Sequence, residues 1–428
     1  AWGILRVYDK EQADLKKLTS GFSIKGDIPK ALPVCPADAP VKSFNVVALD
    51  YPGMKFNAKA PESIEVDFER KIQISNPEAK IYALEEDTAK VASGMQPMPL
   101  TLRVNVGDCV KVNLKNKMKE GKASFSAIGL AFDPKDSLGA NVGNNPGDQT
   151  IVPGAERIYT YYADPFNGET TSLVWDWGNV MTNPRNGLFG AVVVGPKGSK
   201  YRDSKTGADL THKNAWAADV IIDRSVPGNE MRANYRDVAL FFQDEDNIIG
   251  TSFMPYVQNV AGLIGINYRS EPYKYREEQG CSLGKMFQPC NVDKPEDPTT
   301  PLIEAHIGDP VRIHVIGASN EQNGMFSVER HEWPIEPFMR GADLISVVEF
   351  AGSEVLDAFL PSAGGPYRLP GDYVYSNQRL PYSQSGQWGY VRVLPAGDTR
   401  LLPLTGAGAG MKSASVEPPV QVIPVAAK

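Results

Sequence analysis

"PMPLTLRVNVGDCVKVNL", residues 97–114, occurs again in altered form as "TTPLIEAHIGDPVRIHVI", residues 299–316. Each copy contains a short strand, a Gly-Asp turn and a second short strand. Short strands joined by such turns are typical of antiparallel β-sandwiches. Because the unit occurs twice, the sequence predicts two copies of one β-domain.

A second repeat predicts where each domain ends. "LFGAVVVGP" (188–196) and "WGYVRVLP" (388–395) share an aromatic or apolar start, a glycine and an apolar strand. We therefore place domain one at 40–198 and domain two at 213–397, followed by a linker-like tail at 398–428. A third copy, "WGILRVYDK" at 2–10, predicts that residues 1–10 are the closing strand of a further, upstream domain.

One segment departs from the β pattern. Residues 77–92 have Asn76 as a candidate cap, and Ile81, Leu84 and Ala89 share one helical stripe. The other periodic segments are short and bounded by Gly, Pro and Asn. We therefore expect an all-β chain of two sandwiches with a short helical insertion.

Length and charge limit the classes of function. The 428 residues exceed the roughly 250–300 at which single domains usually split, which agrees with two domains. The formal net charge of −7 argues against nucleic acid or an anionic membrane surface as a partner. No apolar run approaches the roughly 18 residues of a membrane-spanning helix, so no membrane span is expected.

The four cysteines predict two disulfides in an oxidising compartment. Cys281 and Cys290 would close a short loop in a turn-rich insertion, and Cys35 and Cys109 would pair within the first half. The chain has no Cys-x-x-Cys motif, which argues against zinc and thioredoxin-like sites. The pairing predicts an extracytoplasmic location, periplasmic or secreted; the alternative is four buried free thiols.

A set of motifs follows in fixed order through the first half. After Gly-Asp-x-Val-x-Val come "FSAIGLAFDPKDSLGA" (125–140), "VPGAERIYTYYADP" (152–165) and "SLVWDWGNVMTNPRNGLFGAVVVGP" (172–196). This order resembles a cupredoxin domain of the multicopper oxidases, and is most similar to the large bacterial manganese-oxidase-type proteins with ceruloplasmin-like, multi-domain organisation. The resemblance covers the chain outside its tail and implies two cupredoxin-like Greek-key β-sandwich domains.

The same resemblance implies copper ligands that this chain lacks. The family's trinuclear centre uses His-x-His pairs on strands, and its type 1 centre uses a Cys thiolate, two His and usually a Met. The chain has four histidines, none of them two residues from another. The family's copper positions hold Ser126, Ile128, Asp176, Gly178, Glu329, Ser376, Asn377, Gln378 and Tyr382, with Gln387 at the axial position. We therefore expect no copper cofactor in this chain, and copper, if any, elsewhere in an assembly.

Weaker candidates for other metals remain. Glu329 and His331 offer a carboxylate and an imidazole, while Asp244 and Asp246 in "FFQDEDNIIGTS" (241–252) suit manganese or calcium. The polar turn at 133–139 is a further candidate for calcium. The ordinary interpretations are a salt-bridged histidine, a solvated strand end and a turn, because two or three scattered ligands rarely make a tight site.

Three functions stay open. The favoured hypothesis is a copper-free structural or interaction part of a manganese-oxidase-type assembly, cut by proteolytic processing from a larger precursor. Other cupredoxin-domain chains of that precursor or complex would then carry any metal oxidation. The second is an independent copper-free extracytoplasmic scaffold, similar to bacterial cell-division proteins that resemble multicopper oxidases. The third is a metal-binding oxidase that uses Glu329, His331 or the acidic loop. On the first two hypotheses this chain alone is no enzyme.

Overall fold

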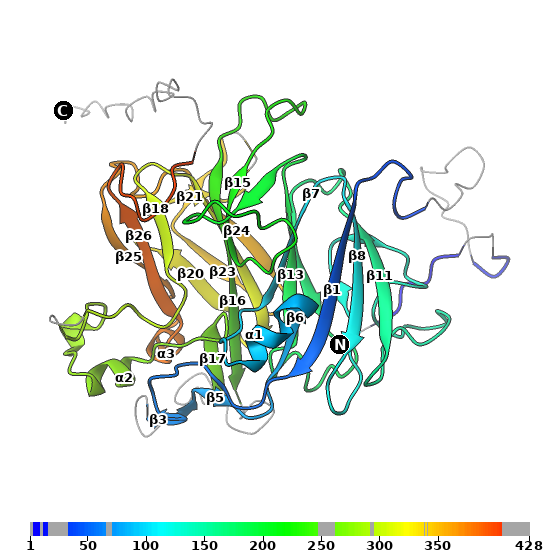
Figure 1. Cartoon of the computed structure of the whole chain (residues 1–428), viewed down its shortest axis with the longest axis horizontal. Coiled ribbons are helices and arrows are strands. Elements are labelled where there is room, and N and C mark those ends of the chain that lie inside the picture. The colour runs from blue at the N-terminus through cyan, green and yellow to red at the C-terminus, as the bar shows by residue number, and fades with distance from the viewer. Residues whose placement is uncertain are drawn as a thin grey trace, which may run out of the picture. The chain divides into compact units, whose positions relative to one another are not determined.

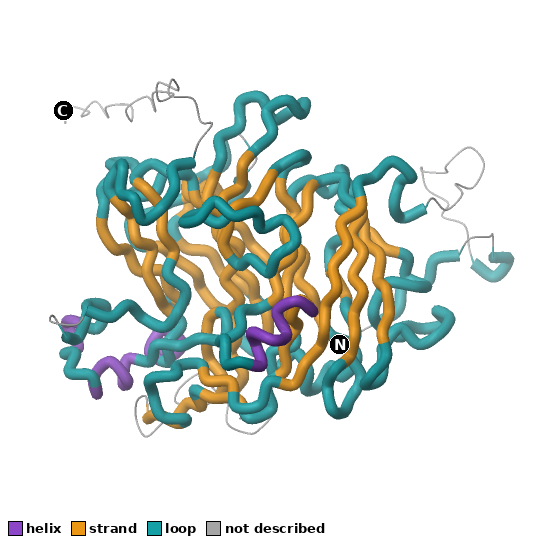
Figure 2. Tube along the Cα trace, in the orientation of Figure 1, coloured by secondary structure: helices purple, strands orange, loops and turns teal. Residues whose placement is uncertain are grey.

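The computed structural model describes residues 3–8, 12–15, 33–65, 71–246, 262–291, 295–337, 339 and 341–404. It separates into two compact units. Unit 1 comprises Ala1–Lys55 and Ser75–Val194, and unit 2 comprises Phe56–Ile74 and Gly195–Lys428. Strands dominate both units and helices are short (Figures 1 and 2), so the all-β prediction is confirmed. The domain limits predicted above, including residues 1–10, stay predictions.

Unit 1 contains two main sheets that enclose an apolar core. The first has five strands in the order β10 (Ala131–Phe132), β11 (Glu156–Tyr162), β8 (Cys109–Asn116), β1 (Val41–Asp50) and β6 (Lys80–Leu84). The second has the order β7 (Leu100–Asn105), β13 (Phe189–Gly195), β12 (Thr170–Trp175) and β9 (Ser126–Ala127), and β2 (Met54–Lys55) pairs with β5 (Ser75–Asn76). Alternate residues of β8, namely Val110, Val112 and Leu114, point into the core, as a two-residue period requires.

Unit 2 is built on the same plan. One sheet contains β14 (Lys200–Arg202), β15 (Ala217–Ile221), β16 (Tyr235–Asp246), β17 (Gly262–Ile266), β4 (Lys71–Gln73) and β3 (Ser63–Glu65), together with β19 (Val311–Asn320) and β24 (Val355–Leu360). The other has the order β18 (Ile303–His306), β26 (Trp388–Leu394), β25 (Gly371–Asn377), β20 (Gly324–Val328) and β23 (Val347–Phe350). Two further short strands, β21 (Trp333–Pro334) and β22 (Leu344–Ile345), pair with each other as a separate two-stranded sheet.

The repeated Gly-Asp turn has one geometry in both units. It joins β7 to β8 in unit 1 and β18 to β19 in unit 2, and in each case carries the chain from one sheet to the other. Gly107 and Gly308 have φ of 91° and 81°, a region that favours glycine. Asp108 Oδ2 accepts the Asn105 N–H at 2.8 Å, and Asp309 Oδ2 accepts the His306 N–H at 2.9 Å. The sequence repeat is therefore a structural repeat.

The helical prediction for residues 77–92 was wrong over most of its length. Lys80–Leu84 is strand β6, which pairs antiparallel with β1 so that Leu84 lies opposite Val46. Only the 3₁₀ turn η1 (Glu85–Asp87) and α1 (Thr88–Ala92) follow it. Ile81 and Leu84 are buried as the stripe required, but the hydrogen bonds offered by β1 outweigh the local helical preference. The remaining helical segments are α2 (Tyr273–Glu278), η2 (Leu283–Lys285) and α3 (Leu380–Gln384).

Both predicted disulfides are present. Cys35 joins Cys109 with a Cα–Cα distance of 5.6 Å, and Cys281 joins Cys290 at 4.7 Å. The first ties the segment before β1 to β8, and the second closes the loop that follows α2. Within the described ranges, no helix is both long and apolar enough to cross a bilayer.

Candidate functional site

The loop between β25 and β26 is the place where the resemblance puts a type 1 copper, and two buried amides occupy it. Asn377 Nδ2 donates to Gln387 Oε1 at 2.8 Å, and both residues are fully buried. Gln387 Nε2 in turn donates to the Gln243 carbonyl at 2.8 Å, while Asn377 Oδ1 accepts the Met325 N–H at 3.0 Å. The pair therefore connects the loop to β16 and β20 by hydrogen bonds.

The neighbouring polar side chains of this loop are also hydrogen-bonded to one another. Gln378 Nε2 donates to Ser327 Oγ at 2.5 Å and to Ser376 Oγ at 3.1 Å. Tyr382 of α3 is buried, and the Arg379 guanidinium lies 4.9 Å from the centre of its ring. These groups are amides and hydroxyls, whereas a type 1 copper requires a thiolate and imidazoles. The donor set of the loop does not fit copper.

In unit 1 the positions of the second histidine pair hold an acid and a closely packed glycine. Asp176 Oδ1 accepts the Ser124 N–H at 2.7 Å, and its Oδ2 accepts the Asn179 N–H at 3.1 Å and Asn183 Nδ2 at 2.8 Å. Burial raises the pKa of Asp176, and these donors oppose the rise. A Cβ at Gly178 would collide with the backbone of residues 122–123, so this backbone has no room for an imidazole.

The first histidine-pair positions in unit 1 do not share an environment. Ser126 is buried in β9, while Ile128, just beyond the strand, is 42% exposed. Ser126 lies opposite Trp175 of β12 in the sheet register. Neither side chain supplies a nitrogen or sulfur ligand, so this pair also does not fit copper.

His331 has both ring nitrogens in hydrogen bonds to the backbone. The Gly364 N–H donates to Nε2 at 3.0 Å, so Nε2 is the acceptor and Nδ1 carries the proton that it donates to the Glu329 carbonyl at 2.7 Å. Burial lowers the pKa of His331, with the Glu329 carbonyl opposing it, which agrees with a neutral ring. Glu329 Oε2 accepts the Val374 N–H at 3.2 Å. In this arrangement the imidazole presents no lone pair to a metal ion.

The acidic strand end does not gather ligands within the described part of the chain. Asp244 is buried, burial raises its pKa well above the ordinary value, and its Oδ1 accepts the Glu321 N–H at 2.6 Å. The Asp246 side chain and residues 247–261 lie outside the described residues. In the candidate calcium turn, Asp133 accepts the Lys135 N–H and Asp136 pairs with Arg157. Across the described ranges, no three His, Cys, Asp or Glu residues come together to hold one ion.

Sequence reasoning missed a buried charged cluster in unit 2. Arg312 and His314 alternate on β19 and therefore share one face, where β16 supplies Asp237 and β24 supplies Asp357. His314 Nε2 lies 2.9 Å from Asp237 Oδ2 and its Nδ1 lies 2.5 Å from Asp357 Oδ1. Arg312 Nη2 donates to Asp357 Oδ2 at 2.5 Å. The signal was present in "VRIHVI" (311–316), two basic residues at alternate positions of an apolar strand.

The charges of this cluster determine its protonation. Burial alone would lower the pKa of His314, but the Asp237 and Asp357 carboxylates outweigh it and raise the pKa. Burial would raise the pKa of Asp357, but Arg312 and His314 hold it well below its usual range. With a carboxylate on each ring nitrogen, His314 is a buried imidazolium. The cluster joins three strands, and we assign it a structural role.

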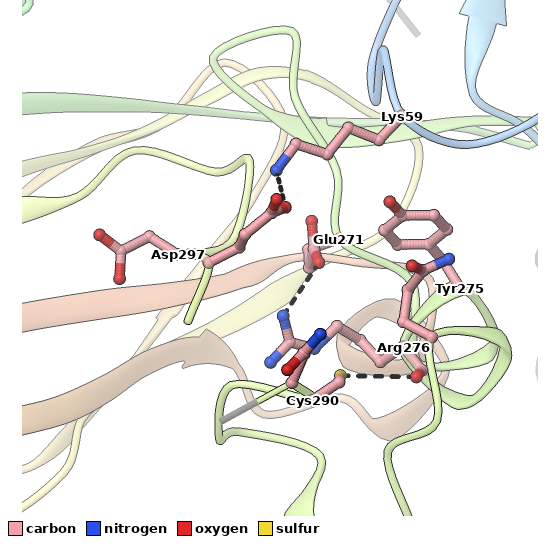
Figure 3. Close-up of a pocket in the computed structure, with 9 residues that line it drawn as sticks. Lys59, Glu271, Tyr275, Arg276, Cys290 and Asp297 are labelled. Atoms are coloured by element: carbon pink, nitrogen blue, oxygen red, sulfur yellow. Dashed lines mark hydrogen bonds and ion pairs between the residues drawn. The ribbon is translucent and has the colours of Figure 1, made fainter. Parts of the chain in front are cut away.

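Unit 2 also contains a polar pocket of about 180 Å³ beside the Cys281–Cys290 disulfide (Figure 3). On its wall, Arg276 Nη1 donates to Glu271 Oε1 at 3.3 Å, and Glu271 Oε2 also accepts the Thr299 N–H at 3.0 Å. Lys59 and Glu296 form an ion pair at its exposed rim. Asp297, the remaining acid of the lining, pairs with Arg392 outside the pocket. These charged groups of the lining are engaged in ion pairs, and they form no nucleophile–base pair.

Comparisons with known proteins are limited to structural similarity. No family model matches the chain, and no curated protein matches it. A multicopper oxidase structure is 14% identical with a TM-score of 0.46 and covers 84% of this chain and 91% of its own. A blue copper oxidase from Nitrosomonas europaea is 15% identical (TM-score 0.49; 82% and 86% covered), and a copper nitrite reductase from the same organism is 13% identical (0.48; 86% and 98%). The chain is similar to these proteins, but similarity at this level assigns it neither ligands nor activity.

Proposed function

We propose that this chain is a copper-free structural and interaction part of a multicopper-oxidase-like assembly of the manganese-oxidase type. Other cupredoxin-domain chains, or other parts of the same precursor, then carry any copper and any metal oxidation. The observation that supports the proposal most strongly is the Asn377–Gln387 amide pair in the loop that the sequence resemblance assigns to a type 1 centre. Buried amides that bond to each other and to the backbone fix a loop without a metal.

The histidine-pair positions support the same proposal by different means. Asp176 ties its loop together through backbone and side-chain donors, and Gly178 is packed against the neighbouring backbone. His331 is held as a neutral ring between two backbone groups. At each of these three positions the residue present thus contributes to the local structure. The two disulfides are consistent with the proposed extracytoplasmic location.

Copper binding by the isolated chain tests the proposal. The purified chain is incubated with excess Cu²⁺, dialysed, and analysed for metal content and visible absorption. We expect well under one copper per chain and no blue charge-transfer band, because all four cysteines are in disulfides and leave no thiolate for a type 1 site. The variant His212→Ala, which removes an exposed histidine, controls for adventitious binding at the surface.

Two outcomes separate this proposal from its rivals. Stoichiometric copper that survives dialysis in both the native chain and His212→Ala would overturn it. Stoichiometric manganese lost in His331→Ala would favour the metal-oxidase alternative. Intact-mass analysis of the native particle distinguishes an assembly from an independent scaffold, because the scaffold would be found without other cupredoxin-domain chains.

A further inference from the structure

Three stretches of the chain share one pattern, and one of them has no place in the sheets of this structure. Phe189–Gly195 forms β13 between β7 and β12, and Trp388–Leu394 forms β26 between β18 and β25. The stretch at 2–8 repeats the Trp, Gly, Arg and Val of β26 at the same spacing, but no strand is assigned to residues 3–8. Leu5 and Val7 are 91% and 84% exposed, whereas their counterparts in β26 are 0% and 2% exposed.

The glycine of the pattern has a steric reason in the two strands that are paired. A Cβ at Gly389 would collide with the ring of Tyr375 on β25, and a Cβ at Gly190 would collide with the Leu100 backbone on β7. At Gly3 the corresponding space is open: apart from its neighbours in the chain, no atom of the described residues lies within 4 Å of where a Cβ would be. Glycine at position 3 is thus suited to a close neighbour that the described structure does not contain.

The arginine and the apolar residues of the pattern divide between two faces. In β26 the Arg392 guanidinium donates to Asp372 and Asp297 at 2.7–2.9 Å, while the flanking Val391 and Val393 belong to the core. The two-residue period of a strand would place Arg6 outward and Leu5 and Val7 inward in the same way. An exposed apolar segment of this pattern favours pairing with an open sheet edge.

We propose that Gly3–Tyr8 is the closing strand of a β-sandwich that lies outside residues 1–428. The partner is a sandwich with an unfilled gap between two strands, one parallel and one antiparallel to the incoming segment, as β18 and β25 are to β26. Its gap has an apolar floor for Leu5 and Val7 and a carboxylate for Arg6, with backbone hydrogen bonds on both sides. Ile4, which lies near Gly143 in unit 1, leaves that contact on binding. The inference rests on the interaction role in the proposed function.

Site-specific photocrosslinking tests the inference. Benzoylphenylalanine is placed at position 5 and, separately, at position 4 of the full chain in the cells that make it, and crosslinked peptides are identified by mass spectrometry. Position 5 should label inward-facing residues of a β-sandwich outside residues 1–428, and position 4 should label residues on the opposite face. The mass of the product on a denaturing gel distinguishes a separate polypeptide from a preceding part of the same one.

A matched pair of variants shows whether the segment's own side chains matter. Leu5→Asp should reduce the crosslink from position 4 at least tenfold, whereas Phe166→Asp, at an apolar side chain that is 94% exposed elsewhere in unit 1, should leave it unchanged. Crosslinks confined to residues 33–404 of the same chain, labelling without alternation between faces, or no crosslink at all would each overturn the inference. Copper content is read separately, so failure of this test does not imply failure of the copper-free proposal.

Discussion

Unit 1 has a fully buried aspartate beside a strand, and unit 2 has an aspartate within a strand whose side chain is 17% exposed. The two carboxyls have opposite pKa shifts. Asp176 of unit 1 is surrounded by backbone N–H groups and an amide, and burial raises its pKa. Asp357 of unit 2 lies against Arg312 and His314, which lower its pKa although it is largely removed from water. Neutral donors only partly replace water around a carboxylate, whereas cations in contact more than replace it. Burial therefore sets the direction of the pKa shift at Asp176, and the neighbouring cations set it at Asp357.

Sheet register explains how the cluster of unit 2 forms. Asp357 lies opposite His314 in the β19–β24 pair, and Asp237 lies opposite Arg312 in the β16–β19 pair. On the corresponding strand of unit 1, β8, the positions of Arg312 and His314 hold Lys111 and Asn113. Lys111 is exposed and lies opposite Ser43 and Thr160, so neither flanking strand supplies an acid to it. Two charged residues on one strand face thus become a cluster only when both flanking strands supply acids at the facing positions.

Of the variants that test this comparison, Asp357→Asn should lower the free energy of unfolding most. It leaves Arg312 and His314 buried without their shared carboxylate, and losing one partner of a buried ion pair typically costs about 3–5 kcal/mol. Denaturant-induced unfolding measures the loss. The control is Asp372→Asn, which removes an exposed partner of Arg392 and should cost no more than about 1 kcal/mol. Equal losses in the two variants would contradict a buried imidazolium cluster.

The variant Asp176→Asn should have a smaller effect. The new amide N–H₂ would face one of the N–H donors that now bond to Asp176, so the expected loss is about 1–3 kcal/mol. Asp133→Asn, in an exposed turn where the carboxylate accepts one backbone N–H, should cost less than about 0.5 kcal/mol. A loss for Asp176→Asn as large as that for Asp357→Asn would mean that cations are not what distinguishes the two sites.

The pH dependence of the unfolding free energy should distinguish the two sites further, with effects smaller than those of the substitutions. A lowered pKa at Asp357 gives stability that is present above its unfolded pKa of about 4 and is lost as pH falls. A raised pKa at His314 gives stability that is present below about 6.5 and is lost as pH rises through the folded pKa. A raised pKa at Asp176 gives stability at low pH that is lost as pH rises.

The difference in unfolding free energy between the native chain and each variant, measured from pH 3 to 9, isolates these contributions. The difference for Asp357→Asn should be largest between about pH 4 and 6.5 and should shrink on the acid side. The difference for Asp176→Asn should be larger at acid pH than at neutral pH. Each unit of pKa shift corresponds to about 1.4 kcal/mol, so profiles that are flat to within this value would refute the assigned shifts.

The sequence by itself determined the features that depend on local spacing. Gly107-Asp108 and Gly308-Asp309 specify the same turn because a glycine with positive φ and a short acid act within a few residues. The cysteine spacing predicted both disulfides, and the residues at the copper positions ruled out a thiolate–imidazole set without any coordinates. The Gly-Asp turns and the Cys281–Cys290 bridge depend on residues close together in the chain. The Cys35–Cys109 pair, 74 residues apart, could be predicted because only two cysteines remained, and the copper positions followed from the family resemblance.

The tertiary structure alone decided what depends on residues far apart in sequence. Lys80–Leu84 became a strand because β1 offered it an edge, which no helical stripe could reveal. The Asn377–Gln387 pair is tied to Gln243, and His314 lies between Asp237 and Asp357, only because the sheet order brings those segments together. Side chains on one strand follow a two-residue period that can be read locally, whereas their partners depend on which strand lies alongside and in which register.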